Sequence, residues 1–174
     1  ILTLPSGERL EIPENLRIIL EVDSLEQATA ATVSRCGMVW FSEDTLTLDM
    51  CLQHLYHSMR NEDITGDAQS IPSAQISFLD SIETIVISDI TSDALRFSMM
   101  QDHIMQPTRE RLLISFKALI VQGIRHTIDY DEKHPDFPMT GEHLSNFAKR
   151  WAVHALFWSF AGSTSWTVRQ KFSD

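Results

Sequence analysis

The sequence predicts a chain that begins as α/β and continues as mostly helix. Short apolar runs, rich in Leu, Ile and Val, occupy residues 16–22 and 36–41. From residue 44 onward, apolar residues recur instead at spacings of three and four, which is the period of a helix facing a core. We therefore expect strands of a parallel sheet in residues 1–43 and a mainly helical part in residues 44–174.

The first twelve residues, ILTLPSGERLEI, predict a β-hairpin. Two short alternating segments flank Pro5, Ser6 and Gly7, which are residue types that favour a tight turn. The two apolar runs that follow, LRIILEV at 16–22 and CGMVWF at 36–41, are short and apolar enough for strands buried on both faces.

A short helix is expected between these two strands, over residues 24–32. Ser24 can cap its first turn, and Gln27, three positions later, completes a capping-box pattern. The order strand, helix, strand is typical of an α/β arrangement.

The second part predicts several amphipathic helices. The first begins near Asp44, and the polar segment 61–73 that follows it is the best internal loop. Residues 74–105 are rich in β-branched residues, but their apolar pattern favours helix, interrupted before Asp93.

Two longer helices complete the second part. Pro107 and Thr108 open the pattern TRERLLISFKALIVQGIRHTIDY, and the two prolines of DEKHPDFPM end it. The last clear helix is expected from Gly141 to Phe160, capped by Thr140 and closed near Gly162.

Charge and cysteine content limit the function classes. The 174 residues carry 24 acidic and 14 basic side chains, a net charge of -10, with no Lys/Arg run, which argues against direct binding to nucleic acid. The chain shows no secretory signal and no apolar stretch of 18 residues, so we expect no membrane segment and an intracellular protein with reduced thiols. Ile1 opens an apparent strand and residues 169–174 continue a helical pattern, so we expect a fragment of a longer protein.

Motifs for phosphate binding and nucleophilic catalysis are missing from the sequence. A phosphate-binding loop needs glycines followed by Lys, yet none of the four lysines follows a glycine. The segment ETIVISD could place Asp89 at an acidic strand end, but a second acid is missing. No G-x-S-x-G occurs, and GSTSW at 162–166 is typical of a connection between helices.

Two side-chain clusters have structural and functional interpretations. Cys51, His54 and His57 suggest a zinc site, but steps of three on a helix diverge by about 60 degrees each, and a fourth ligand is missing. Packing of Cys51 is favoured. The aromatic residues on and around the last long helix suggest a core, or a face against a neighbouring module: Phe147, Trp151, Phe157, Trp158 and Phe160.

Arg35 lies directly before the apolar run 36–41, in ATVSRCGMVWF. A charge at this position must reach solvent or meet an anion. The residues alone favour a surface arginine with a local carboxylate partner.

Two regions of the chain resemble, in amino-acid sequence, members of the dynein heavy chain family. LTLPSGERLEIPENLRIILEVDSLEQATAATVSRCGMVWFS is similar to the stretch that follows the acidic strand end in the second AAA+ module of these proteins. DEKHPDFPM and RWAVHALFWSFAG resemble the later part of the same module, closest to the cytoplasmic type. The resemblance spans essentially the whole chain and is loose at 60–105.

The resemblance implies roles for several residues. The hairpin becomes an insertion of the module, 16–22 its sensor strand, and 44–174 the helical lid. Asp23 takes the place of the first nucleotide sensor, where many AAA+ proteins carry Asn, which puts hydrolysis at this module's own site in doubt.

Three arginines acquire roles through the same resemblance. Arg35 corresponds to an arginine finger that acts on the ATP of the preceding module. Arg109 is a candidate second sensor, with an ordinary solvated charge as the alternative, and Arg111 is the fallback.

The function implied is that of one part of an ATP-driven, minus-end-directed microtubule motor in the cytoplasm. ATP or ADP and Mg²⁺ would serve the intact motor, and the fragment alone is expected to bind no cofactor or metal and to hydrolyse no ATP. Implied partners are the other AAA+ modules, microtubules, and dynein intermediate and light chains. The alternative is a non-catalytic helical interaction module with a face around Trp151, Phe157 and Trp158.

Overall fold

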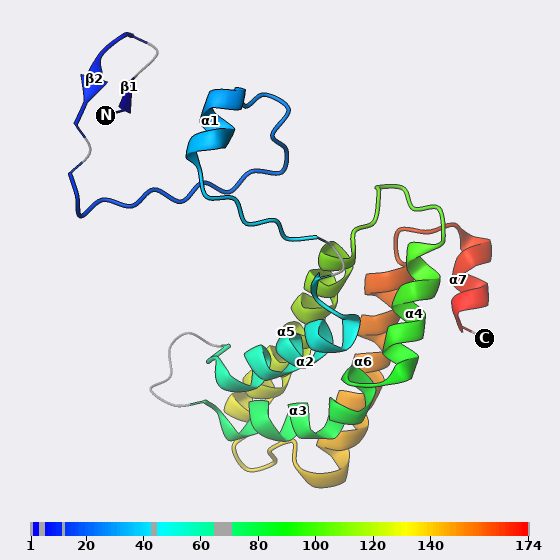
Figure 1. The fold of residues 1–174 in the computed structure, drawn as a ribbon. Helices are drawn as coiled ribbons and strands as arrows, with labels where there is room; N and C mark the ends of the chain where they lie inside the picture. The colour runs from blue at the N-terminus through cyan, green and yellow to red at the C-terminus, as the bar shows by residue number, and fades with distance from the viewer. Residues whose placement is uncertain (1, 4–5, 12, 43–44, 65–70, 174) are drawn as a thin grey trace. The chain divides into compact units, whose positions relative to one another are not determined.

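The computed structural model describes residues 2–3, 6–11, 13–42, 45–64 and 71–173 (Figure 1). Its internal contacts divide the chain into two compact units, residues 1–42 and residues 43–174.

The first unit opens with an antiparallel pair of strands, β1 (Leu2–Thr3) and β2 (Arg9–Leu10). Leu2 lies opposite Leu10, and Thr3 lies opposite Arg9. Gly7, in the connection between them, has a φ of 87°, a conformation that glycine adopts without steric cost. Pro5 of the expected turn lies outside the described residues.

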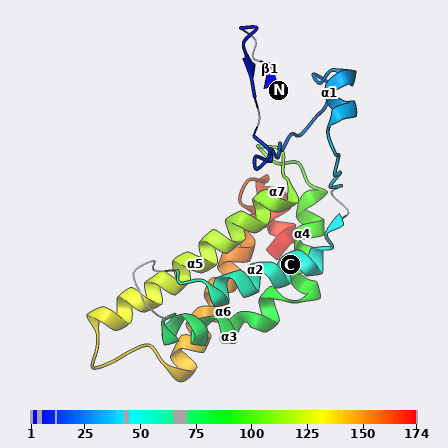
Figure 2. The same cartoon turned by 60° about the vertical axis from the view of Figure 1, so that its left-hand side comes forward.

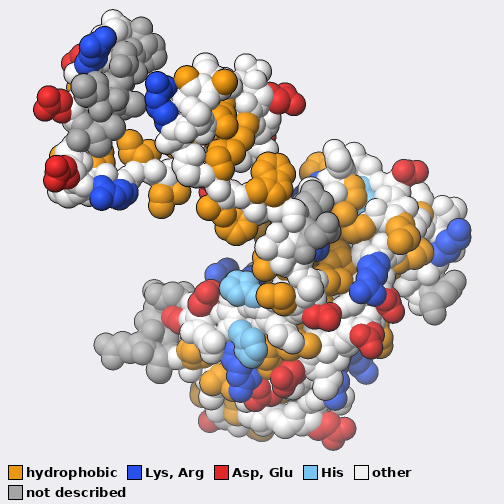
Figure 3. All heavy atoms as spheres, viewed as in Figure 1, with side chains coloured by type: hydrophobic (Ala, Val, Ile, Leu, Met, Phe, Trp, Pro, Cys, Tyr) orange, Lys and Arg blue, Asp and Glu red, His pale blue; other side chains and the backbone are white. Residues whose placement is uncertain are grey.

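The strands expected at 16–22 and 36–41 are not formed in this structure. Neither run forms a ladder, and both expose their side chains, with Ile19 94% and Trp40 77% exposed. Apolar side chains accordingly lie on the surface of this unit (Figure 3). A strand is stable only when a neighbour accepts and donates its backbone hydrogen bonds, and the described residues supply no such neighbour.

The helix expected at 24–32 is displaced toward the C-terminus. The observed helix, α1 (Ala30–Arg35), begins after Thr29, whose side chain accepts a hydrogen bond from the Thr32 N–H at 3.2 Å. Ser24 instead accepts from the Glu26 N–H at 3.2 Å. A local bond of this kind stabilises a turn in place of the helix that Ser24 was expected to cap.

The second unit is a bundle in which six helices are described. Their bounds are α2 (Leu48–Asn61), α3 (Ser73–Val86), α4 (Asp89–Met99), α5 (Arg109–Lys133), α6 (Gly141–Ala161) and α7 (Trp166–Ser173). The model thus confirms a mostly helical fold. None of the helices among the described residues is long and apolar enough to cross a membrane.

Side-chain caps explain where several of these helices begin. Thr47, Ser88 and Thr108 each accept a hydrogen bond from a backbone N–H in the first turn of α2, α4 and α5. The cap at Ser88 places the interruption of 74–105 at residues 87–88, which lie before Asp93 as expected. Asp89 is therefore the first residue of α4 rather than the end of a strand.

The core of the bundle lies where α6 packs along α3 and α5 (Figure 2). Tyr56, Phe78, Phe116 and Phe160 are fully buried there, one from each of α2, α3, α5 and α6. The rings of Phe116 and Phe160 lie 5.6 Å apart. Burial of each such side chain contributes about 1.5–3 kcal/mol.

α6 packs tightly against α5 at Gly123. A Cβ built on Gly123 would lie 2.4 Å from Cδ1 of Trp151, so only glycine leaves room for the indole. Trp151 is also fixed by its own hydrogen bond, from Nε1 to the Leu119 carbonyl at 2.7 Å. The indole therefore cannot move aside without loss of this bond.

We expect Gly123→Ala to destabilise the chain. Overpacking costs about 1–3 kcal/mol, which exceeds the roughly 1 kcal/mol that alanine gains over glycine in a helix. Chemical denaturation measures the change. Gly37→Ala is the matched control, since a Cβ there meets nothing within 4 Å. A Gly123→Ala chain more stable than the parent would contradict this account of the α5–α6 contact.

Candidate functional site

Arg35 is the last residue of α1, and its side chain is exposed. Its Nη1 donates a hydrogen bond to the Ala31 carbonyl at 3.2 Å, and a positive charge at a helix C-terminus is electrostatically favourable. No carboxylate lies within ion-pair distance of Arg35 among the residues described. The local carboxylate partner that composition alone favoured is not found in that part of the chain.

Asp23 lies in the same unit, at the end of the run 16–22, and is exposed. Arg109 and Arg111 lie in the other unit. Asp23 and Arg35 therefore share the first unit, whereas Arg109 and Arg111 share α5.

Arg109 is the first residue of α5 and is held by local partners. Its Nη1 donates to the Leu46 carbonyl at 2.9 Å, and its Nε lies 3.1 Å from Oε1 of Glu110. A basic residue at a helix N-terminus is disfavoured by the helix dipole, and these two contacts offset that cost. Arg109 thereby ties the segment before α2 to the start of α5, a role that the sequence did not indicate.

Arg111 is bonded in a similar way. Its Nη1 donates to the Gln106 carbonyl at 2.9 Å, while its backbone N–H donates to Oγ1 of Thr108 at 3.2 Å. Both candidate sensors in the first turn of α5 thus bind backbone carbonyls close to the helix start. Their guanidinium groups form hydrogen bonds with the connections that precede α2 and α5.

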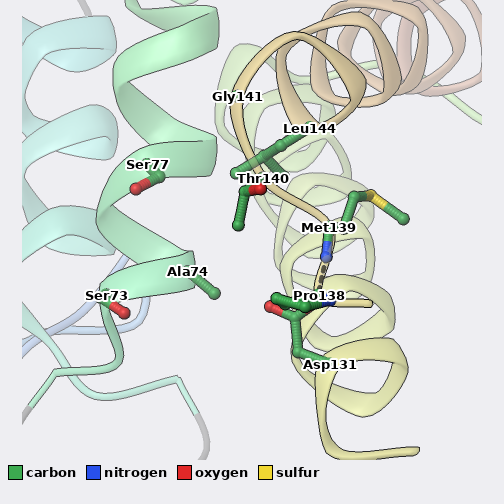
Figure 4. A pocket seen from close by; sticks show the side chains of 9 residues that line it. All are labelled: Ser73, Ala74, Ser77, Asp131, Pro138, Met139, Thr140, Gly141 and Leu144. Carbon is green, nitrogen blue, oxygen red and sulfur yellow. Dashed lines mark hydrogen bonds between the residues drawn. The ribbon is translucent and has the colours of Figure 1, made fainter. Parts of the chain in front are cut away.

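A small pocket lies between the start of α3, the end of α5 and the start of α6 (Figure 4). Its volume is about 210 Å³, below the usual range for small-molecule sites. The charged group in it, Asp131, accepts a hydrogen bond through Oδ1 from the Met139 N–H at 2.7 Å. A carboxylate repels phosphate, so this pocket does not suit a nucleotide.

The cluster of Cys51, His54 and His57 does not form a metal site. No group of three metal-ligating side chains occurs in the part of the chain that the structure describes. Cys51 packs against the core, whereas His54 and His57 are exposed. Side chains three residues apart on a helix diverge in direction, which explains why Cys51 faces the core while His54 and His57 face solvent.

The aromatic cluster of α6 is divided between core and surface. Phe160 is fully buried and Phe147 packs edge-on against Phe78, with ring centroids 6.2 Å apart. Trp151 is half-buried and packs against α5. Trp158, in contrast, is 47% exposed.

His103 is a polar contact that sequence reasoning missed. It lies in the connection between α4 and α5, with Nε2 2.9 Å from the Ser98 carbonyl and Nδ1 2.7 Å from Oγ of Ser163. A carbonyl only accepts, so Nε2 carries the proton and Ser163 donates to Nδ1 when the ring is neutral. The segment GSTSW, which joins α6 to α7, is thereby held against the end of α4.

Tyr56 and Arg60 are the groups in the described ranges whose pKa values clearly depart from the ordinary ones. Burial raises the pKa of Tyr56, and the charge of Glu83 adds to the effect. The hydrogen bond to Asp80 raises the pKa of Arg60. Both groups belong to the contact of α2 with α3, away from the candidate arginines in sequence.

We expect the stability of the chain to fall in alkali through Tyr56. Because its pKa in the folded chain is raised above the ordinary 10.0, the neutral phenol stabilises the fold below that pH, and the contribution is lost as pH rises through the folded pKa. Denaturant unfolding at about pH 8 and about pH 11 should show a larger loss for the parent than for Tyr56→Phe. An equal loss in both chains would refute the assignment.

Comparison with known proteins adds a family match to this geometry. Residues 84–174, just over half of the chain, match the model of the dynein heavy chain AAA lid domain. The match covers the end of α3 and all of α4 to α7.

Relatives align with the whole chain. It is 35% identical over 192 residues to the cytoplasmic dynein heavy chain of Drosophila melanogaster, and 37% identical over 185 residues to that of Neurospora crassa. Both alignments cover 100% of this chain and 4% of the relative, so the chain spans about 4% of their length. A dynein heavy chain-like protein of Plasmodium falciparum is 54% identical over 63 residues, which cover 36% of this chain and 1% of that protein.

Proposed function

This chain belongs to the dynein heavy chain AAA lid domain family, and we propose on that basis that it forms the end of the second AAA+ module of a cytoplasmic-type heavy chain. Residues 44–174 are then the helical lid, in keeping with the family match over 84–174 and with the six-helix bundle. Residues 1–43 are the last part of the α/β subdomain.

The proposed activity of the parent protein is that of an ATP-driven, minus-end-directed microtubule motor of the cytoplasm. The support is the similarity to proteins named cytoplasmic dynein heavy chains. Its partners would be the other AAA+ modules of the same chain, microtubules, and intermediate and light chains. ATP and Mg²⁺ would bind elsewhere in the motor, because no glycine-rich loop followed by Lys is present in this sequence.

Arg35 is the residue that we propose takes part in the chemistry. One observation carries this proposal: an exposed guanidinium at the end of α1 that binds only a backbone carbonyl and no described carboxylate. A guanidinium is always charged and can spread several N–H donors over a γ-phosphoryl group as charge develops. Arginines that act in this way raise the rate of nucleotide hydrolysis about 10³- to 10⁵-fold.

Asp23, Arg109 and Arg111 remain weaker proposals. Asp23 would stand at the first sensor, where a carboxylate cannot donate the hydrogen bond that Asn donates. A sensor role for Arg109 requires it to leave the Leu46 carbonyl, and Arg111 would have to leave that of Gln106. These bonds favour a structural role for both.

The exposed apolar runs 16–22 and 36–41 support the assignment of the first unit. Large apolar side chains are exposed along both, among them Leu20 at 72% and Phe41 at 78%. Exposed apolar surface of this extent is typical of a surface that is covered in the assembled protein. We propose that both runs pair as strands with the remainder of the α/β subdomain.

The rival function is a helical interaction module built around Trp151, Phe157 and Trp158. Trp151 is only partly available for it, since its indole packs on Gly123 and binds Leu119. The coding sequence before Ile1 distinguishes the motor function from the interaction module. A G-x-x-x-x-G-K-[ST] loop there supports the motor, and its absence favours the interaction module.

We expect Arg35→Ala in the intact heavy chain to lower ATP turnover at the first module at least about tenfold, as for a finger acting in trans. Arg35→Lys should restore little, because an ammonium cannot bridge two phosphate oxygens in the same geometry. Microtubule-stimulated ATP turnover is the measurement.

Arg17→Ala is the matched control. Arg17 is also exposed, lies in the same unit and binds backbone carbonyls through Nη1, so its loss should leave turnover unchanged. Equal turnover in Arg35→Ala and the parent, with the ring folded, would eliminate the finger.

Hydrogen exchange tests the proposed strands independently of catalysis. Amides of 16–22 and 36–41 should exchange at nearly unfolded rates in the isolated 174-residue chain, and at least about a hundredfold more slowly in the intact heavy chain, where ladder bonds protect them. Comparable rates in the two proteins would sink the strand assignment while leaving the lid assignment intact.

A further inference from the structure

The part of α6 and α7 that follows Glu142, in the first turn of α6, differs in charge from the rest of the chain. Residues 143–173 contain four basic side chains and no acidic one, whereas the remaining residues hold ten basic side chains and all 24 acidic ones. The local charge is therefore +4 against -14 elsewhere, from 4 minus 0 and 10 minus 24. A local excess of positive charge attracts partners of negative charge.

Arg150, His154 and Trp158 lie along one side of α6. Their spacing of four residues places them on one helical face, and all three are exposed. The rings of His154 and Trp158 are 6.3 Å apart, and the guanidinium of Arg169, from α7, lies 5.7 Å above the Trp158 ring. Val153, 60% exposed, flanks them. We name these five residues the basic aromatic face.

The positive charges of the basic aromatic face are not neutralised within the described part of the chain. Arg150 and Arg169 form no ion pair there. Arg169 donates from Nη2 to the Gly162 carbonyl at 2.8 Å, but its buried Nε has no acceptor. A guanidinium that rests on an indole and meets no carboxylate retains its capacity to bind an anion.

We infer that the basic aromatic face docks an acidic protein segment that also carries aliphatic side chains. Its carboxylates would meet Arg150 and Arg169, and its aliphatic groups would cover Val153 and the free surface of Trp158. Interfaces are enriched in Trp and Arg of this kind. Nucleic acid is disfavoured as the occupant, because the charge of -14 on the rest of the chain repels a phosphate backbone.

The experiment compares the isolated 174-residue chain with the intact heavy chain. It therefore rests on the proposed function, in which this chain is part of such a heavy chain. Hydroxyl-radical labelling of Trp158 and Val153 should fall at least about fivefold in the heavy chain, since docking covers the exposed apolar surface. Carbodiimide should join the amine of Lys149, which is exposed beside Arg150, to carboxylates of one acidic segment.

Two variants test the charges, and a third variant is the control. Arg150→Gln and Arg169→Gln should each restore labelling of Trp158 in the heavy chain. Lys133→Gln removes the same charge at the end of α5, which Figures 1 and 2 place away from α7, and should change nothing. If loss of the hydrogen bond from Arg169 disturbs α7, the Arg150→Gln variant still tests the inference.

Equal labelling in the two proteins, or cross-links scattered over many segments, would overturn the inference. Protection that nuclease removes would overturn it in favour of nucleic acid. The ATP turnover of Arg35→Ala is a separate readout, so a failure of the finger and a failure of this docking surface are distinguishable.

Discussion

The contact of α6 with α5 and α3 is the interaction on which the helical unit depends. Small buried residues of α6, Ala148, Ala152 and Ala155, let the neighbouring helices come close, and Gly123 of α5 admits the indole of Trp151. Close packing of this kind leaves few alternative arrangements. The candidate sensors lie at the start of α5, and the basic aromatic face lies mainly on α6 with Arg169 from α7. The packing of α6 therefore fixes the positions of both.

The two units are stabilised to different degrees, and this difference bears on function. The buried hydrophobic core belongs entirely to the helical unit, whereas the described side chains of the first unit are mostly exposed. Arg35 thus lies on a segment with little packing of its own. We propose that the remainder of the heavy chain fixes its position, as expected for a residue that acts on the nucleotide of a neighbour.

The helices were largely predictable, and the first unit was not. α5 and α6 follow from apolar period, the cap at Thr108 and prolines, all of which act within a few residues. The runs 16–22 and 36–41 have strand composition, but a strand needs a partner that local sequence does not specify. Of the candidate site, the sequence indicated the arginines but not the bond of Arg109 to Leu46 or the contacts of His103, because these join segments distant in sequence.

A structure of the intact heavy chain with a transition-state analogue of ATP hydrolysis at the first module tests the central claim most directly. The account predicts that the guanidinium of Arg35 lies within about 3 Å of the oxygens of the γ-phosphate mimic, the distance of a charge-assisted hydrogen bond. An Arg35 side chain that faces solvent or a carboxylate of its own module, with another cation at the mimic, would contradict it.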